Sequence, residues 1–74
     1  MHIESLVRMA NQIGAFFEAM PDRPEALENA AMHLKRFWEP RMRQQLLLHV
    51  DGGGDKDLNP LVAEAISRHR VLLG

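Results

Sequence analysis

The chain has 74 residues, a formal net charge of −1 and no cysteine. A chain of this length buries only about 60–65% of the surface that its unfolded form exposes, and without thiols it has neither disulfides nor thiolate metal ligands. Its charge provides no global field that would draw it to nucleic acid or anionic lipid. No apolar run exceeds three residues, which excludes a membrane span and the core of a signal peptide.

The first predicted helix covers residues 3–20. Its apolar residues recur at three- and four-residue spacing and form one stripe, while polar residues cover the opposite side. The stripe comprises Ile3, Leu6, Val7, Ala10, Ile13, Gly14, Phe17 and Met20. Gly14 costs local helix stability, yet it lets another helix approach closely. We therefore interpret Gly14 as a packing glycine.

The second predicted helix covers residues 23–38 and follows a proline-containing turn. Asp22 and Glu25 have the spacing of a capping box, with the aspartate in the cap position. Acidic residues come early in this helix and basic residues late, as the helix dipole favours. The residues expected to face inward are Leu27, Ala30, Ala31, Leu34, Phe37 and Trp38.

Residues 35–43 combine four cations, the single tryptophan and a helix-breaking proline. Proline pushes the preceding residue out of the helical region, so we expect a corner at Pro40 and a third helix over about residues 41–50. Arg41 and Arg43 then lie in the first turn of that helix, where the macrodipole disfavours each cation by about 0.3–1 kcal/mol. This cost suggests compensation from outside the chain, for example by an acidic partner surface.

A plainer interpretation of the same corner stays open. Glu39 and Arg43 are four positions apart in the orientation that favours a surface ion pair. Phe37 and Trp38 can fill a small core from the end of a helix. If Pro40 only kinks one long helix, both arginines become mid-helix residues and the dipole cost disappears.

Leu48 lies off the apolar stripe of the third helix, so it is either ordinary surface or a contact for another chain. Residues 51–58 are interpreted as a flexible acidic linker, because their three glycines follow no strand and precede no Gly-Lys-Ser/Thr. The last predicted helix covers residues 60–72, with Asn59 as its N-cap. Together these patterns predict an all-α fold, a small single domain over residues 1–74 with three to four helices and a proline corner.

The residues offer no arrangement typical of catalysis or metal binding. Threonine and tyrosine are absent as well as cysteine. The histidines never share the i,i+4 spacing that presents two imidazoles on one helical face; they are His2, His33, His49 and His69. We therefore predict no catalytic, cofactor-binding or metal-binding residues, although a site assembled only by tertiary contacts stays open.

Nucleic-acid binding is not favoured either. Arginines beside aromatics can contact phosphates and stack on bases, and the last two helices can imitate a helix-turn-helix. That motif uses a short turn, however, whereas the connection here is long and holds three aspartates. The negative net charge also removes the attraction on which non-specific binding relies.

Four blocks of the sequence carry a resemblance to a known family. They are Leu6-Val7-Arg8-Met9-Ala10-Asn11-Gln12-Ile13 with Phe16-Phe17, Pro21-Asp22-Arg23, Phe37-Trp38-Glu39-Pro40-Arg41-Met42-Arg43, and Asn59-Pro60-Leu61-Val62. The third block is the most specific. Through these blocks the chain resembles, over nearly its whole length, the delta subunit of the cytoplasmic, molybdenum-containing, NAD-dependent formate dehydrogenases.

The resemblance implies an accessory role without chemistry of its own. In that family the alpha subunit carries molybdopterin guanine dinucleotide and iron–sulfur clusters. The beta and gamma subunits carry FMN and further clusters and pass electrons to NAD. The delta subunit is associated with assembly, cofactor maturation or stability of the active complex. The resemblance thus implies a cytoplasmic, non-catalytic subunit without a cofactor, whose partner is the catalytic alpha subunit.

The resemblance supplies no contact residues, so the partner-binding surface is predicted from the corner. Aromatic residues and arginines are the types that most often dominate interface energy. The predicted partner-binding residues are Arg36, Phe37, Trp38, Pro40, Arg41, Arg43 and Leu48. The alternative is a freestanding helical homodimer, paired through residues 46–48, with a regulatory or nucleic-acid-binding role.

Overall fold

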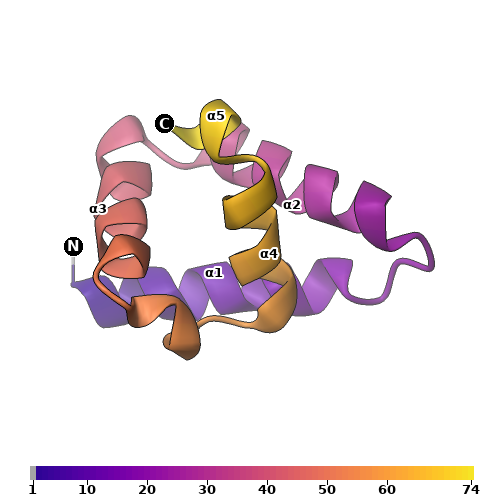
Figure 1. The fold of residues 1–74 in the computed structure, drawn as a ribbon, viewed down its shortest axis with the longest axis horizontal. Helices are drawn as coiled ribbons and strands as arrows, with labels where there is room; N and C mark the ends of the chain where they lie inside the picture. The colour runs from indigo at the N-terminus through magenta and orange to yellow at the C-terminus, as the bar shows by residue number, and fades with distance from the viewer. Residues whose placement is uncertain (1) are drawn as a thin grey trace.

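The computed structural model describes residues 2–74, and in this range all the regular secondary structure is helical (Figure 1). The elements are α1 (Ile3–Phe17), α2 (Arg23–Phe37), α3 (Pro40–Asp51), the 3-10 helix η1 (Gly54–Asp57), α4 (Pro60–Arg68) and α5 (Arg70–Leu73). No strand occurs in the described residues. The predicted all-α fold with a corner at Pro40 is confirmed.

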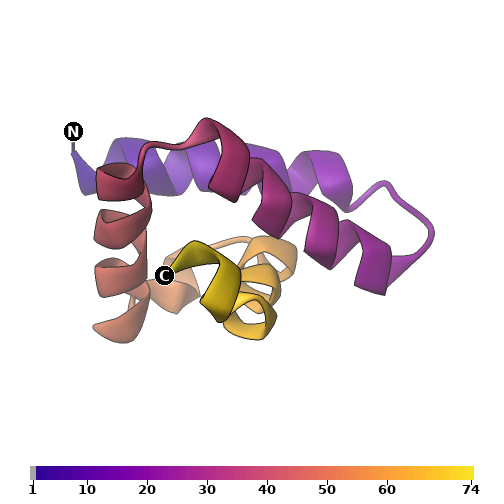
Figure 2. The same cartoon turned by 90° about the horizontal axis from the view of Figure 1, so that it is seen from above.

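The helices form two layers. α1 and α2 run side by side in opposite directions and make up the first layer (Figure 2). α3 turns away at the corner and crosses the end of this pair near the start of α1. α4 and α5 cover one face of the pair, where α4 contacts both α1 and α2. The opposite face of the α1–α2 pair is left without a covering helix among the described residues.

The core lies between the two layers and is entirely apolar. Its main cluster is made of buried residues from every helix except η1, together with Leu58 from the connection before α4; the members are Leu6, Ala10, Leu34, Trp38, Leu46, Leu47, Leu58, Val62, Ile66 and Leu73. A second cluster joins α2 to α4 through Ala26, Leu27, Ala30, Leu61 and Ala65. Small alanines at this contact allow the two helix backbones to approach closely.

The structure departs from the predicted elements by more than one residue in three places. α1 ends at Phe17 rather than at residue 20; a turn follows, in which the Met20 N–H donates to the Phe17 carbonyl, and Pro21 keeps Met20 out of the helical conformation. The segment expected to be a flexible linker instead contains η1, and Leu58 is 7% exposed and part of the core. The last helix is interrupted at His69, which lets α5 turn back so that Leu73 enters the core.

Two of the predicted helix starts, those of α2 and α4, carry the side-chain caps that were expected. Asp22 Oδ1 accepts a hydrogen bond from the Glu25 backbone N–H at 3.3 Å at the start of α2. Asn59 Oδ1 accepts from the backbone N–H groups of Leu61 at 2.8 Å and Val62 at 3.4 Å at the start of α4. These caps satisfy donors that the first helical turn leaves without an intrahelical partner.

Gly14 is the packing glycine that the sequence predicted. It is buried in α1, and a Cβ placed on it would lie 2.6 Å from Oδ1 and 2.8 Å from Cγ of Asn59. Asn59 is further held by Asn11, whose Oδ1 accepts its backbone N–H at 2.7 Å, and by Glu18, which accepts from its side-chain amide. The start of α4 is thereby fixed against α1.

Candidate functional site

The corner between α2 and α3 forms as its proline requires. Trp38 follows α2 in an extended conformation, with φ −91° and ψ 139°. Glu39 is also extended, and Pro40 occupies the first turn of α3, where its missing N–H costs nothing. Pro40 therefore begins a new helix rather than kinking a continuous one.

Trp38 and Phe37 point in different directions from this corner. Trp38 is only 5% exposed and belongs to the main core cluster, as does Leu34 one turn earlier. Phe37 is 72% exposed, so the expectation that it faces inward is wrong. Its ring lies instead against the imidazole of His33, with the ring centroids 4.7 Å apart and the ring planes tilted by 41°. The indole that the docking hypothesis placed outward is therefore a core side chain, as the plainer interpretation of the corner expected.

Arg43 is tied back to the end of α2. Its Nη1 donates to the backbone carbonyls of Lys35 at 3.0 Å and Trp38 at 2.9 Å. The last turn of a helix leaves carbonyls without partners and carries the negative end of the dipole, so a guanidinium there is stabilising. The dipole cost expected at the start of α3 is thus compensated for Arg43 within the chain. The expected ion pair between Glu39 and Arg43 does not appear among the ion pairs of residues 2–74.

Arg36, Arg41 and Leu48 remain at the surface. Both arginines are exposed, and neither has a carboxylate partner within ion-pairing distance in the part of the chain that is described. Leu48 is 71% exposed and lies seven residues after Arg41, which places the two on one face of α3. Arg36, Phe37, Pro40 and Arg41 are exposed at the corner itself, and Leu48 lies about two turns further along α3; we call these five residues the corner surface.

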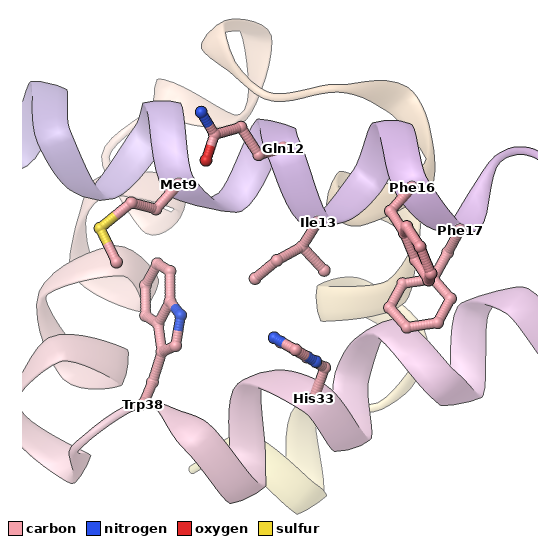
Figure 3. A pocket seen from close by; sticks show the side chains of 7 residues that line it. All are labelled: Met9, Gln12, Ile13, Phe16, Phe17, His33 and Trp38. Atoms are coloured by element: carbon pink, nitrogen blue, oxygen red, sulfur yellow. The ribbon is translucent and has the colours of Figure 1, made fainter.

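A groove that the sequence analysis did not predict lies between α1 and α2. It has a volume of about 380 Å³ and is lined by Met9, Gln12, Ile13, Phe16, Phe17, His33 and Trp38. Figure 3 shows Met9 and Trp38 at one end and the two phenylalanines at the other. Phe16 is 72% exposed. The signal available in the sequence was Phe16 itself, a large aromatic residue off the apolar stripe of its helix.

Two ion pairs between helices lie away from this groove. Arg70 donates to both carboxylate oxygens of Asp51 at 2.9 Å and 2.7 Å, linking α5 to the end of α3. This hydrogen bonding lowers the pKa of Asp51 below its ordinary value and raises the pKa of Arg70. Glu64 on α4 accepts from Arg23 on α2, which lowers the pKa of the Glu64 carboxyl. These pairs consolidate the fold.

Two further features of the described residues bear on function. No group of three histidine, aspartate or glutamate side chains in residues 2–74 lies close enough together to hold a metal ion. Within the same range, no helix is both long and apolar enough to traverse a lipid bilayer.

One comparison with known proteins gives a match. No curated protein and no solved structure matches the chain. A family model described as the NADH-dependent formate dehydrogenase delta subunit FdsD matches residues 5–66, which run from the first turn of α1 through the corner to Ile66 in α4. Because this match covers most of the sequence, the chain belongs to the family of formate dehydrogenase delta subunits.

Proposed function

We propose that this chain is a non-catalytic accessory subunit that docks on the catalytic alpha subunit of a cytoplasmic NAD-dependent formate dehydrogenase. The observation that carries the proposal is the family match over residues 5–66. In this proposal the other subunits bind molybdopterin guanine dinucleotide, the iron–sulfur clusters, FMN and NAD. The delta subunit supports assembly, cofactor maturation or stability of the complex by binding alone.

The corner surface is the docking site that we propose for this role. Phe37 offers an exposed ring, while Arg36 and Arg41 offer guanidinium groups without a carboxylate partner in residues 2–74. Such residues are typical anchors of protein interfaces. Trp38 and Arg43 support this surface indirectly. Trp38 fills the core beneath the corner, and Arg43 fixes the end of α2 through its hydrogen bonds.

Docking can stabilise the alpha subunit without any covalent step. A protein that binds only the folded, cofactor-loaded form of its partner shifts the equilibrium toward that form by mass action. The effect grows with the concentration of the delta subunit relative to its dissociation constant. An accessory chain therefore needs a complementary surface and no active-site residues.

Deletion of this chain from the complex tests the proposal. The molybdenum content, the formate-dependent reduction of NAD and the half-life of that activity are measured with and without the chain. Low molybdenum content without the chain supports a role in cofactor maturation, and full content with a shorter half-life supports a structural role. Unchanged values of all three, together with no binding of the purified chain to the alpha subunit, would contradict the proposal.

A further inference from the structure

Arg43 supports the corner with only one edge of its guanidinium group. Its hydrogen bonds to the carbonyls of Lys35 and Trp38 both come from Nη1. The opposite edge carries Nε–H and one N–H of Nη2, which lie parallel and can donate together to one carboxylate. Within residues 2–74 neither of these two nitrogens donates a hydrogen bond. The chain therefore uses one half of this group and leaves the other half without an acceptor.

The unused edge of Arg43 reaches from the interior to the surface. Its Nε is the only side-chain nitrogen or oxygen of the described residues that is buried without a hydrogen-bond partner. Such exceptions are rare in folded proteins and call for an explanation. Nη2 is also unpaired but is not enclosed, so an incoming acceptor can meet it from outside. Completing the pair at Nε then requires a small shift of the side chains that cover it.

The chain uses the same edge of another arginine to hold a carboxylate in its own fold. Arg23 donates to Oε1 of Glu64 from Nε at 3.1 Å and from Nη2 at 2.7 Å. Arginine suits such recognition because its planar fork matches a carboxylate, whereas lysine offers a single charged group. The free edge of Arg43 is therefore chemically suited to an aspartate or glutamate side chain.

The surroundings of this edge are positively charged. Residues 35–43 hold four cations and one carboxylate, a net charge of +3, whereas the whole chain carries −1. The carboxylate, Glu39, is exposed and is in no ion pair in the part of the chain that is described. It also gives no side-chain cap to the first turn of α3. Because the described residues leave this positive charge unneutralised, the corner attracts a negatively charged group.

We propose that the free edge of Arg43 binds the carboxylate of an aspartate or glutamate side chain on the alpha subunit, with Arg36 and Arg41 adding attraction. The inference rests on the proposed function and specifies the chemistry of its docking site. A nucleic acid is a poorer occupant, because an extended polyanion would also meet the negative charge of the rest of the chain. The exposed ring of Phe37 at the same corner suits a protein surface.

The test measures retention of the chain in a complex purified through a tag on the alpha subunit. Arg43→Lys keeps a positive charge and a donor for the carbonyls of α2, but it removes the paired edge. We expect its affinity for the complex to fall by about tenfold or more, while the isolated variant unfolds near the wild-type thermal midpoint. Arg23→Lys is the matched control, since Glu64 already occupies the corresponding edge of Arg23. The control should be retained like the wild-type chain, and wild-type retention of Arg43→Lys would overturn the inference.

Photo-crosslinking and a double-mutant cycle identify the carboxylate. A photoreactive residue at the exposed position 39 should crosslink to a segment of the alpha subunit that contains an aspartate or glutamate. Changing that acid to its amide should weaken retention about as much as Arg43→Lys does, and combining both changes should add little further. Any loss of stability in Arg43→Lys appears on both sides of the cycle and cancels from the coupling. Additive losses, or a crosslinked segment without a carboxylate, would overturn the inference.

Measurements on the wild-type chain separate this inference from the proposed function. Retention that resists nuclease and weakens as salt screens the attraction supports the carboxylate. Release of the chain by nuclease would show a nucleic-acid occupant, and crosslinks from position 39 to a second copy would show self-association; either result would overturn the inference. If the wild-type chain is not retained by the complex at all, the proposed function fails instead.

Discussion

Arg43 reaches back across the proline corner and donates from Nη1 to the backbone carbonyl of Trp38 at 2.9 Å. The same nitrogen donates to the carbonyl of Lys35 at 3.0 Å, so one side chain closes the end of α2 from the first turn of α3. The corner is therefore held by a contact between two helices rather than by its proline alone. This contact converts a cation that is unfavourable at the start of one helix into a favourable one at the end of another.

Replacement of Arg43 by alanine should destabilise the folded chain. The two carbonyls lose their charged donor, and hydrogen bonds to charged groups contribute about 1.5–3 kcal/mol. Urea unfolding should therefore show a clear drop in midpoint at an unchanged slope. Arg41→Ala is the matched control, because this neighbouring arginine is exposed and makes no side-chain hydrogen bond in residues 2–74. Equal midpoints for the two variants would contradict the capping role.

The single tryptophan reports directly on the corner. Trp38 is 5% exposed, so its fluorescence should be blue-shifted and shielded from acrylamide in the folded chain, and should shift to the red in urea. Trp38→Ala should cost about 3–5 kcal/mol, as other large-to-small core substitutions do. Phe37→Ala removes the neighbouring aromatic ring, which is 72% exposed, and should cost much less. If the folded chain showed the emission maximum of a solvent-exposed indole, the buried placement of Trp38 would be contradicted.

Gly14→Ala is expected to destabilise the chain although alanine is the better helix former. The added Cβ would lie 2.6 Å from Asn59 Oδ1, and overpacking of this kind costs about 1–3 kcal/mol, against a helix-propensity gain of about 1 kcal/mol. Gly52→Ala is the control, since its Cβ would meet no atom closer than 3.4 Å. The control should be neutral or slightly stabilising. Thermal midpoints of the two variants check the difference, and a more stable Gly14→Ala would show that Asn59 moves aside freely.

Features that depend on nearby residues were predictable from the sequence, whereas features that depend on the packing of distant segments were not. The caps at Asp22 and Asn59 depend on residues a few positions away, and Gly14 stands out within one apolar stripe; all three were predicted and are confirmed. Phe37 and Trp38 lie three and four positions after Leu34, so a continuing helix would place both on the face of Leu34. The chain instead leaves the helix at Trp38, and only one of the two rings is buried. Deciding which one requires the position of α3, which no local pattern provides.

The groove escaped prediction for the same reason. Its lining combines residues of α1 with His33 and Trp38 from α2 and its end, so it exists only once the two helices are paired. Its accessibility further depends on which face of the pair α4 covers. Within the first helix alone, Met9 and Phe16 are isolated apolar residues on a mostly polar side.

The ion pair between Asp51 and Arg70 should make stability depend on pH in the acidic range. The hydrogen bonds from Arg70 lower the pKa of Asp51 in the folded chain, so the unfolded chain binds more protons near the ordinary carboxyl pKa of 3.8. The contribution of the ion pair to the free energy of unfolding is fully present above that value. It is lost as the pH falls through the lower pKa of Asp51 in the folded state. Asp51→Asn should therefore flatten the acidic limb of a stability profile measured between about pH 5 and pH 2. Asp55→Asn, which removes an exposed carboxylate without an ion pair in the described residues, should leave that limb unchanged.

Arg41→Glu combined with Leu48→Asp tests the corner surface as the docking site. Both residues are exposed on one face of α3 and do not hold the fold, so the isolated variant should unfold near the wild-type midpoint. In a complex purified through the alpha subunit, retention of the variant should fall by about tenfold or more, because an interface loses an arginine and an apolar contact together. Lys56→Glu with Val71→Asp is the matched control, with the same two changes at exposed positions outside the corner surface. Loss of retention in the control pair alone would place the interface at η1 or at α5, and equal retention of both pairs would leave the groove as the site that carries docking.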